Sequence, residues 1–288
     1  EVFDFKYESD LVLANVVEKE ANTISEIGFL SEFQGASGVA KITSANWGRW
    51  GFTPIQPMEN YDEYAYLVAR IWVETEATDG FLYIKETSSK SLSTMQTGRW
   101  IDYYFSGETF KSQWTDIASY YSSMATNRAG TYYIDKIYMT NELEVIDFAH
   151  SADLASILKM QDVASVNYLK TYEGANGVAK ITSSGRWVRF NIQPVQEVSA
   201  YANYKYLVVR MYIEAEETPK LTLEPQSGAI ESITPVKTGE WVDYYFDGAT
   251  FYNQLVIGWN NYYSSICANQ QGTYYIDQAY MTNTEPQV

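Results

Sequence analysis

Apolar and polar residues alternate with a period of two in several stretches of the chain. In 206–214 every second residue is apolar, so an extended chain would place these residues on one side. The stretch 66–74 repeats the order, with Leu67, Ala69, Ile71 and Val73 on the apolar side. This alternation predicts strands that bury one face and turn the other away from the core.

Shorter alternating stretches, separated by turns rich in Gly, Asn and Ser, predict further strands. They are 187–193, 100–105 and 241–246, of which the last two follow a Thr-Gly turn. Only 10–20 and 152–161 have helical spacing, and each would be a small appendage. The pattern therefore predicts an all-β chain that folds as two antiparallel β-sandwiches.

The chain contains an internal repeat of about 140 residues. The repeated motifs are GVAKITS (38–44, 177–183), GRW (48–50, 185–187), IQP (55–57, 192–194) and TYYID (131–135, 273–277). The two copies extend over 1–142 and 143–288, and a period of this length indicates a domain duplication rather than a solenoid. Within each copy we expect the first and last strands to be adjacent, because chain ends of such domains tend to lie together.

The order of these motifs resembles that of the jelly-roll carbohydrate-binding modules with the galactose-binding-like fold, which are found attached to bacterial glycan-degrading enzymes. Each copy has an Asp-Phe first strand, a G-x-A-K-I-T strand, a T-G-x-W strand and a closing G-T-Y-Y-I-D-x-x-Y strand. The resemblance implies two tandem jelly-roll domains, a secreted or bacterial cell-surface location, and a place within a larger multidomain protein. Many relatives carry a glutamate after the Asp-Phe that helps to hold a structural calcium, and Lys6 and Ala149 stand there in this chain. The resemblance requires no cofactor, and the sequence leaves open whether a structural calcium is bound.

Composition and charge narrow the possible partners. Aromatic residues make up 16%, and Tyr, with 26 residues, suits both pleated strands and wet binding surfaces. The net charge of −16 argues against nucleic acid and anionic membranes as partners, and no apolar run is long enough to insert into a membrane. Cys267 is the one cysteine and His150 the one histidine, which excludes an intrachain disulfide and multi-histidine metal sites.

Sugar binding needs an exposed aromatic ring for the apolar face of a pyranose and nearby polar groups for its hydroxyls. Trp72 and Tyr212 occupy equivalent non-core strand positions, each two residues after an arginine. Trp50 and Trp187, paired through the GRW motif, would form a second rung of the same face. The predicted ligand-binding residues are Trp50, Gln56, Arg70, Trp72, Trp187, Arg189, Gln193, Arg210, Tyr212 and Trp259.

Other aromatic residues have weaker assignments. Trp100 and Trp241 follow Thr-Gly in both copies and are expected to pack structurally. Trp47, Trp114 and Trp259 have no aromatic residue at the directly equivalent position of the other copy, so the common fold does not require them. They are candidates for ligand contact or for interdomain contact, and accidental surface aromatics are the alternative.

The sequence therefore predicts non-catalytic binding of a polysaccharide or oligosaccharide by two tandem modules, which target a bacterial glycan-degrading system to its substrate. No nucleophile elbow, Walker loop, H-E-x-x-H or EF-hand loop is present. A structural or adhesive protein-interaction module of a cell-surface protein is the alternative. A jelly-roll glycoside hydrolase or lyase is a further one, because the carboxylates are numerous enough for a catalytic pair.

Overall fold

The computed structural model describes residues 1–85, 88–92, 97–148, 151–223, 232–233 and 235–286. Its contacts divide the chain into two compact units, Glu1–Asn141 (unit 1) and Glu142–Val288 (unit 2). Every strand pairing in the described residues is antiparallel, and no sheet there contains strands of both units.

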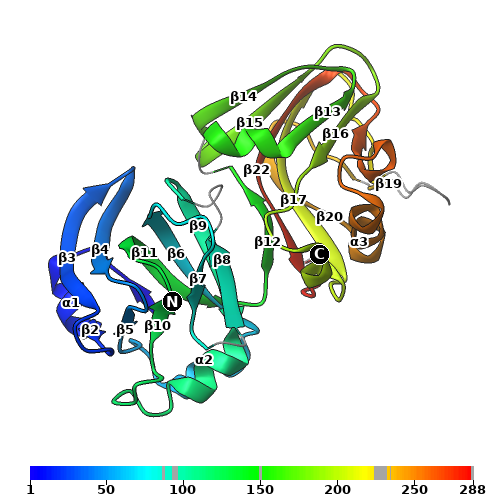
Figure 1. Ribbon diagram of the computed structural model, residues 1–288. Coiled ribbons are helices and arrows are strands. Elements are labelled where there is room, and N and C mark those ends of the chain that lie inside the picture. Colours follow the sequence, from blue (N-terminus) through cyan, green and yellow to red (C-terminus); the bar gives the residue numbers. More distant parts are fainter. Residues whose placement is uncertain (86–87, 93–96, 149–150, 224–231, 234, 287–288) are drawn as a thin grey trace. The chain divides into compact units, whose positions relative to one another are not determined.

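Unit 1 is a sandwich of a larger and a smaller sheet, which in the described residues have six and five strands (Figure 1). The larger sheet has the order β3 (Ile24–Phe33), β4 (Ala36–Ser44), β11 (Gly130–Thr140), β6 (Tyr66–Glu74) and β9 (Trp100–Ser106), with β1 (Phe3–Asp4) also beside β11. The smaller sheet has the order β2 (Val17–Glu18), β5 (Arg49–Gly51), β10 (Met124–Thr126), β7 (Gly80–Tyr83) and β8 (Ser89–Leu92).

Unit 2 repeats this arrangement, again with six and five strands in the described residues (Figure 1). Its larger sheet has the order β14 (Val163–Tyr172), β15 (Ala175–Ser183), β22 (Gly272–Thr282), β17 (Tyr206–Ala215) and β20 (Trp241–Asp247), with β12 (Leu143–Asp147) also beside β22. Its smaller sheet has the order β13 (Ile157–Gln161), β16 (Val188–Ile192), β21 (Ile266–Ala268), β18 (Leu221–Leu223) and β19 (Ser232–Ile233). The predicted all-β class with two antiparallel sandwiches is confirmed, and so is the adjacency of first and last strands.

The period-two pattern places the core as predicted. Leu67, Ala69, Ile71 and Val73 of β6 are buried against the smaller sheet's side chains in the core of unit 1. The intervening residues of β6 lie on the outer face of the larger sheet. Full burial of side chains as large as those of Leu67, Ile71 and Val73 stabilises the unit by about 1.5–3 kcal/mol each.

The repeated GVAKITS motif has a backbone reason for its glycine. Gly38 has a φ of +78°, and a Cβ there would lie 2.0 Å from the carbonyl oxygen of Phe5. Gly177 has a φ of +72°. Glycine at this position therefore lets the β4 strand pass close to the first strand.

The predicted helices were partly wrong. In 10–20 the helix α1 covers only Glu8–Leu13, and in 152–161 a 3-10 turn over Ser151–Ser156 is followed by strand β13. Pairing of β13 with β16 prevails there over the helical spacing of the side chains. The structure adds α2 (Gly107–Gln113) and α3 (Gly248–Ile257), capped by the side chains of Ser106 and Asp247.

The remaining short helical turns cover Met58–Tyr61, Val198–Tyr201 and Tyr262–Ser264. None of the helices in the described residues has the length and hydrophobicity needed to cross a membrane.

Candidate functional site

The predicted site residues lie on two different sheets of each sandwich. Arg70 and Trp72 belong to β6, on the outer face of the larger sheet. Arg189 lies within β16 of the smaller sheet, and Trp187 comes directly before that strand. β16 pairs with β13 and β21, so it cannot supply a second rung beside β17. The expectation of one shared binding face is therefore wrong.

On the larger sheet of unit 1, the predicted platform residue Trp72 belongs to a packed aromatic cluster of Phe33, Trp72, Trp100 and Tyr133. The rings of Phe33 and Tyr133 are stacked, with centroids 3.8 Å apart. Phe33 also meets Trp72 edge-on at 5.7 Å, and the indole N–H of Trp100 donates to the carbonyl of Gln34 at 3.2 Å. The β3–β4 hairpin thus covers the rings that a sugar would need.

Unit 2 has the same cluster, made of Tyr172, Tyr212, Trp241 and Tyr275. Tyr172 and Tyr275 stack at 3.9 Å, and Tyr212 meets Tyr172 edge-on at 5.3 Å. Both stacked tyrosines donate their hydroxyls to Glu214, at 2.6 and 2.9 Å. Burial, followed by this hydrogen bond, raises the pKa of Tyr172 above its usual value. The polar groups of this cluster therefore bind one another.

The arginines beside the two clusters are held by carboxylates. Arg70 lies 3.6 Å from Asp102 and 3.5 Å from Asp135, and Arg210 lies 3.4 Å from Asp277. Burial raises the pKa of both Asp135 and Asp277, although the arginine opposes that shift. These predicted ligand-binding arginines take part in ion pairs of the larger sheets.

Trp50 is a correction, because its side chain is 0% exposed and packs against Tyr132 in the core. The strand registers explain the error. Arg49 is opposite Ala125 and Arg189 is opposite Cys267, so these two arginines are equivalent, and Trp50 corresponds to Phe190. The GRW match aligns 48–50 with 185–187 and is therefore three positions out of this register.

With this register, Trp47 and Trp187 are equivalent, each two residues before its arginine. Trp47 is 62% exposed and Trp187 is 49% exposed. The backbone of Trp47 is in the left-handed region, with φ +62°, and the backbone N–H of Trp187 donates to Asp162 at 3.1 Å. Both indoles are therefore presented at the surface beside the smaller sheet.

The centre of this second region is an arginine stacked on a tyrosine. The guanidinium carbon of Arg49 lies 4.5 Å from the ring centroid of Tyr120, and that of Arg189 lies 4.6 Å from Tyr262. Arg49 also lies 5.5 Å from the ring of Tyr83. Arg49 is itself buried, and its Nη1 donates to the hydroxyl of Ser123 at 2.9 Å, so the stacked guanidinium helps to hold the tyrosine ring in a defined orientation.

A hydrogen bond orients each of these tyrosines. The Tyr120 hydroxyl donates to the Glu20 carboxylate, and this bond raises the pKa of Tyr120. The Tyr262 hydroxyl donates to the amide oxygen of Gln161 at 2.8 Å. Tyr120 is 42% exposed and Tyr262 is 39% exposed, so each ring still reaches the surface.

A second exposed tyrosine, Tyr121 or Tyr263, follows each of them and meets it edge-on. We call these residues the exposed aromatic set of each unit. The set of unit 1 is Trp47, Arg49, Tyr120 and Tyr121, and the set of unit 2 is Trp187, Arg189, Tyr262 and Tyr263. Sequence reasoning identified Trp187 and Arg189 as site residues and considered Trp47, but it missed the tyrosines. The motif Y-Y-S-S occurs in both copies, at 120–123 and 262–265, and was the available signal.

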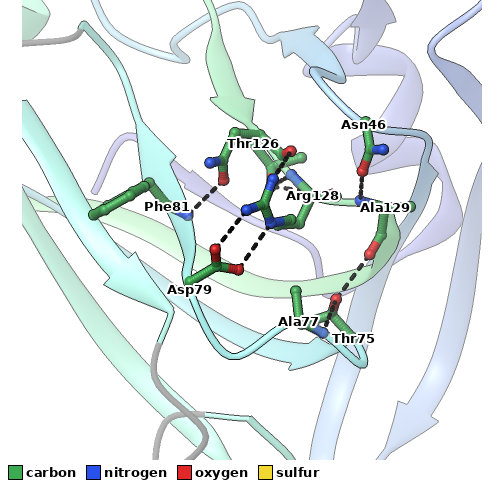
Figure 2. A network of polar contacts seen from close by, with 9 residues as sticks. Asn46, Thr75, Ala77, Asp79, Phe81, Thr126, Arg128 and Ala129 are labelled. Atoms are coloured by element: carbon green, nitrogen blue, oxygen red, sulfur yellow. Dashed lines mark hydrogen bonds and ion pairs between the residues drawn. The ribbon is translucent and has the colours of Figure 1, made fainter.

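In unit 1, polar contacts fix the start of strand β7, which carries Phe81 and Tyr83 next to the exposed aromatic set (Figure 2). Arg128 binds Asp79 through two contacts, Nε to Oδ1 at 3.1 Å and Nη2 to Oδ2 at 2.7 Å. The side chain of Asn127 accepts the backbone N–H of Phe81 at 2.7 Å. Phe81 is exposed and lies two residues before Tyr83, so both side chains face outward from β7.

The other predicted residues lie outside these sets. The side chain of Gln56 accepts a hydrogen bond from Asn60 at 3.2 Å, in the loop after β5. Gln193 lies four residues after Arg189, about 13 Å along an extended chain. The half-buried Trp259 is tied to the smaller sheet through its carbonyl, which accepts from Asn191 at 2.6 Å. Trp114 is buried and donates its indole N–H to Phe52, so it is a core residue.

The described residues contain no cluster of metal-ligating side chains, and their one cysteine is buried. No three His, Cys, Asp or Glu side chains of the described part lie close enough together to hold a metal ion. Lys6 pairs with Asp4 at 2.7 Å, and Ala149 and His150 lie outside the described residues. Cys267 is buried, and burial raises the pKa of its thiol.

Comparison with protein-family models and with curated proteins found no match. Among solved structures, the chain is similar to the N-terminal CBM22-1–CBM22-2 tandem domain of Xyn10C from Paenibacillus barcinonensis, with a TM-score of 0.31 and 11% identity. The similarity covers 93% of this chain and 93% of that chain.

Proposed function

We propose that each unit binds a glycan chain at its exposed aromatic set, on the smaller-sheet side of the sandwich. The observation that carries the proposal is the recurrence of this set at equivalent positions of both units. An exposed Trp, a Tyr-stacked Arg and two exposed Tyr occur around β5 in unit 1 and around β16 in unit 2.

The chemistry of the set matches what a sugar presents. The exposed rings supply flat apolar surfaces for the axial C–H groups of a pyranose, and the tyrosine hydroxyls supply polar groups for its hydroxyls. Arg49 is buried and supports the ring of Tyr120. Glu20 and Gln161 add acceptors next to the tyrosine hydroxyls. Because the tyrosines and arginines are already held by one another, binding would cost little side-chain entropy.

The larger sheets are less suited to this role. Their aromatic rings stack on one another beneath the hairpin, and their arginines pair with carboxylates. A sugar placed there would have to displace the ring stacking and the arginine–aspartate ion pairs that already occupy these side chains. We therefore assign the clusters of the larger sheets to stability.

The proposed biological role is non-catalytic. The two sites would hold a glycan-degrading system of a bacterium on its polysaccharide, in a secreted or cell-surface protein with further domains. Two weak sites on one chain gain affinity for a polymer, because binding at one raises the effective concentration at the other.

Affinity electrophoresis of the intact chain through gels that contain single polysaccharides tests the proposal. We expect retardation by at least one of xylan, mixed-linkage β-glucan, starch-like α-glucan or pectic polysaccharide. The double variant Tyr120→Ala/Tyr262→Ala should migrate as in the polysaccharide-free gel. The matched variant Tyr120→Phe/Tyr262→Phe keeps the rings and should stay retarded.

Migration unaffected by every polysaccharide would contradict glycan binding and favour a structural or adhesive module. Release of reducing sugar or of unsaturated ends from any of these polymers would instead support the hydrolase or lyase alternative.

A further inference from the structure

The exposed aromatic sets of the two units have different charged neighbours. Phe81 of unit 1 corresponds to Lys220 of unit 2, because the backbone N–H of each donates to an asparagine side chain, at 2.7 Å in both cases. The register agrees, since Tyr83 is opposite Ala125 and Thr222 is opposite Cys267. An exposed ring in one unit is thus replaced by an exposed ammonium group in the other.

Two more replacements change the charge in the same direction. Asn46, directly before Trp47, corresponds to Arg186, directly before Trp187. Glu20 binds the hydroxyl of Tyr120, and the neutral Gln161 binds that of Tyr262. At these three positions unit 2 therefore has two more cations and one carboxylate fewer than unit 1, whereas Asp162, beside Trp187, is a carboxylate at the position of Thr23.

The side chain of Arg186 and the backbone of Lys220 both contact Asn269. Arg186 donates through Nε to the backbone carbonyl of Asn269 at 3.2 Å, and Lys220 donates its backbone N–H to the Asn269 side chain. Arg189 faces Cys267, two residues before Asn269 in the chain. Arg186, Arg189 and Lys220 therefore lie along neighbouring strand ends of one sheet.

Two carboxylates near this group accept hydrogen bonds from uncharged donors and keep their charge. Asp162 accepts the backbone N–H of Trp187, and Glu217 accepts from the side chain of Gln270 at 3.0 Å. Within the described residues, neither Arg186 nor Lys220 forms an ion pair. These cations belong to a unit whose nine basic residues are outnumbered by seventeen acidic ones, so their clustering is local.

We propose that the exposed aromatic set of unit 2, together with Arg186 and Lys220, binds an anionic glycan, whereas the set of unit 1 binds a neutral one. The inference rests on the proposed glycan binding and assigns its ligand class. A guanidinium offers paired N–H donors to a carboxylate or sulfate, and an ammonium adds a point charge. In unit 1, the exposed ring of Phe81 extends the stacking surface in place of that charge.

Titration calorimetry on the full chain tests the inference with matched polymers. The probes are polygalacturonate against its carboxyl-reduced form, and dextran sulfate against dextran. The background variant Tyr120→Ala removes stacking in unit 1, so that binding reports unit 2. In this background we expect at least one acidic polymer to bind at least tenfold more tightly than its neutral partner. Tighter binding of polygalacturonate would show that unit 2 recognises carboxylates, and tighter binding of dextran sulfate would show that it recognises sulfates.

Variants of unit 2 then locate the effect. Lys220→Ala and Arg186→Gln should each lower the affinity for the acidic polymer by roughly tenfold, as expected when a hydrogen bond to a charged group is lost. Affinity for the neutral partner should change little. Lys170→Ala removes an exposed lysine from the larger sheet and is the matched control, which should leave both affinities unchanged.

The outcomes separate the two proposals. Equal affinity for acidic and neutral partners would overturn the anionic assignment and leave glycan binding intact. The same holds if Lys170→Ala weakens binding as much as Lys220→Ala does. If no glycan binds either unit, the proposed function fails, and this inference fails with it.

Discussion

The two outer faces of one sandwich carry similar residues that differ in what covers them. In unit 1, the larger sheet presents Arg70 beside Trp72, and the smaller sheet side presents Arg49 beside Tyr120. Arg70 pairs with two aspartates, and Trp72 lies against Phe33. Arg49 is buried too, but it stacks on the ring of Tyr120, which is exposed.

The difference comes from the β3–β4 hairpin. Its residue Phe33 stacks on Tyr133, and its turn residue Gln34 accepts the indole N–H of Trp100. In unit 2, Tyr172 and Glu173 make the equivalent contacts with Tyr275 and Trp241. An aromatic residue on a non-core strand face is therefore no evidence for binding until the neighbouring hairpin is placed.

The largest expected effect comes from breaking the covered cluster. Trp72→Ala should lower the free energy of unfolding by about 3 kcal/mol, because a packed aromatic side chain is removed. Glycan affinity of the folded protein should be unchanged. Thermal or urea unfolding together with calorimetric titration measures both quantities. Lost glycan affinity with unaltered stability would return the binding site to the larger sheet.

The next effect concerns the uncovered face. Tyr262→Ala should weaken glycan binding by unit 2 by about 2 kcal/mol, or roughly thirtyfold, as for an aromatic anchor of an interface. Stability should change by less than about 1 kcal/mol, because the ring is partly exposed. Titration in the Tyr120→Ala background isolates unit 2. Tyr262→Phe is the control, since it keeps the ring and loses only the bond to Gln161.

The strands were predictable because each has one buried and one outward side. Four alternate residues in each of β6 and β17 are aliphatic or Met and buried, so both the strands and their core faces follow from the sequence, although Val68 and Val208 add a buried aliphatic residue on the other face. Strand β13 was not predictable in this way. Its stretch Ile157–Gln161 lies at the edge of the smaller sheet, where only the pairing with β16 defines it.

The binding site was only partly predictable, and the register explains why. Side chains of a strand alternate between faces, so an odd shift in an alignment exchanges core and surface. The GRW match paired the buried Trp50 with the exposed Trp187, although Trp47 is its true equivalent. The contact between Arg49 and Tyr120 joins residues 71 positions apart, which the local pattern cannot show.

A smaller effect is expected at the margin of the exposed set. Trp187→Ala should weaken glycan binding by unit 2 by about 1 kcal/mol, or roughly fivefold, because about half of the side chain remains in solvent. Stability should stay within about 0.5 kcal/mol of the parent. Comparison with Trp50→Ala sharpens the point, since loss of that core residue should cost about 3–5 kcal/mol of stability. Similar stability losses in the two variants would contradict the register that we describe.

The smallest effect concerns the ion pair between Asp79 and Arg128, which lies at the end of the strand that carries Phe81 and Tyr83. The hydrogen bond from Arg128 holds the pKa of Asp79 below its usual value. The stabilisation is therefore fully present above the unfolded pKa of about 3.9 and is lost as the pH falls through the lower folded value.

Asp79→Asn should accordingly lower the melting temperature slightly near neutral pH and have no effect once the pH has fallen below the lowered folded pKa, where the parent carboxyl is also protonated. Scanning calorimetry of parent and variant across this range measures the difference. Salt should reduce it, because the pair is exposed and screened. A difference that persisted at the lowest pH would mean that Asp79 acts through its shape rather than its charge. Glycan binding by unit 1 should then also weaken at every pH, since the position of Phe81 would depend on that side chain.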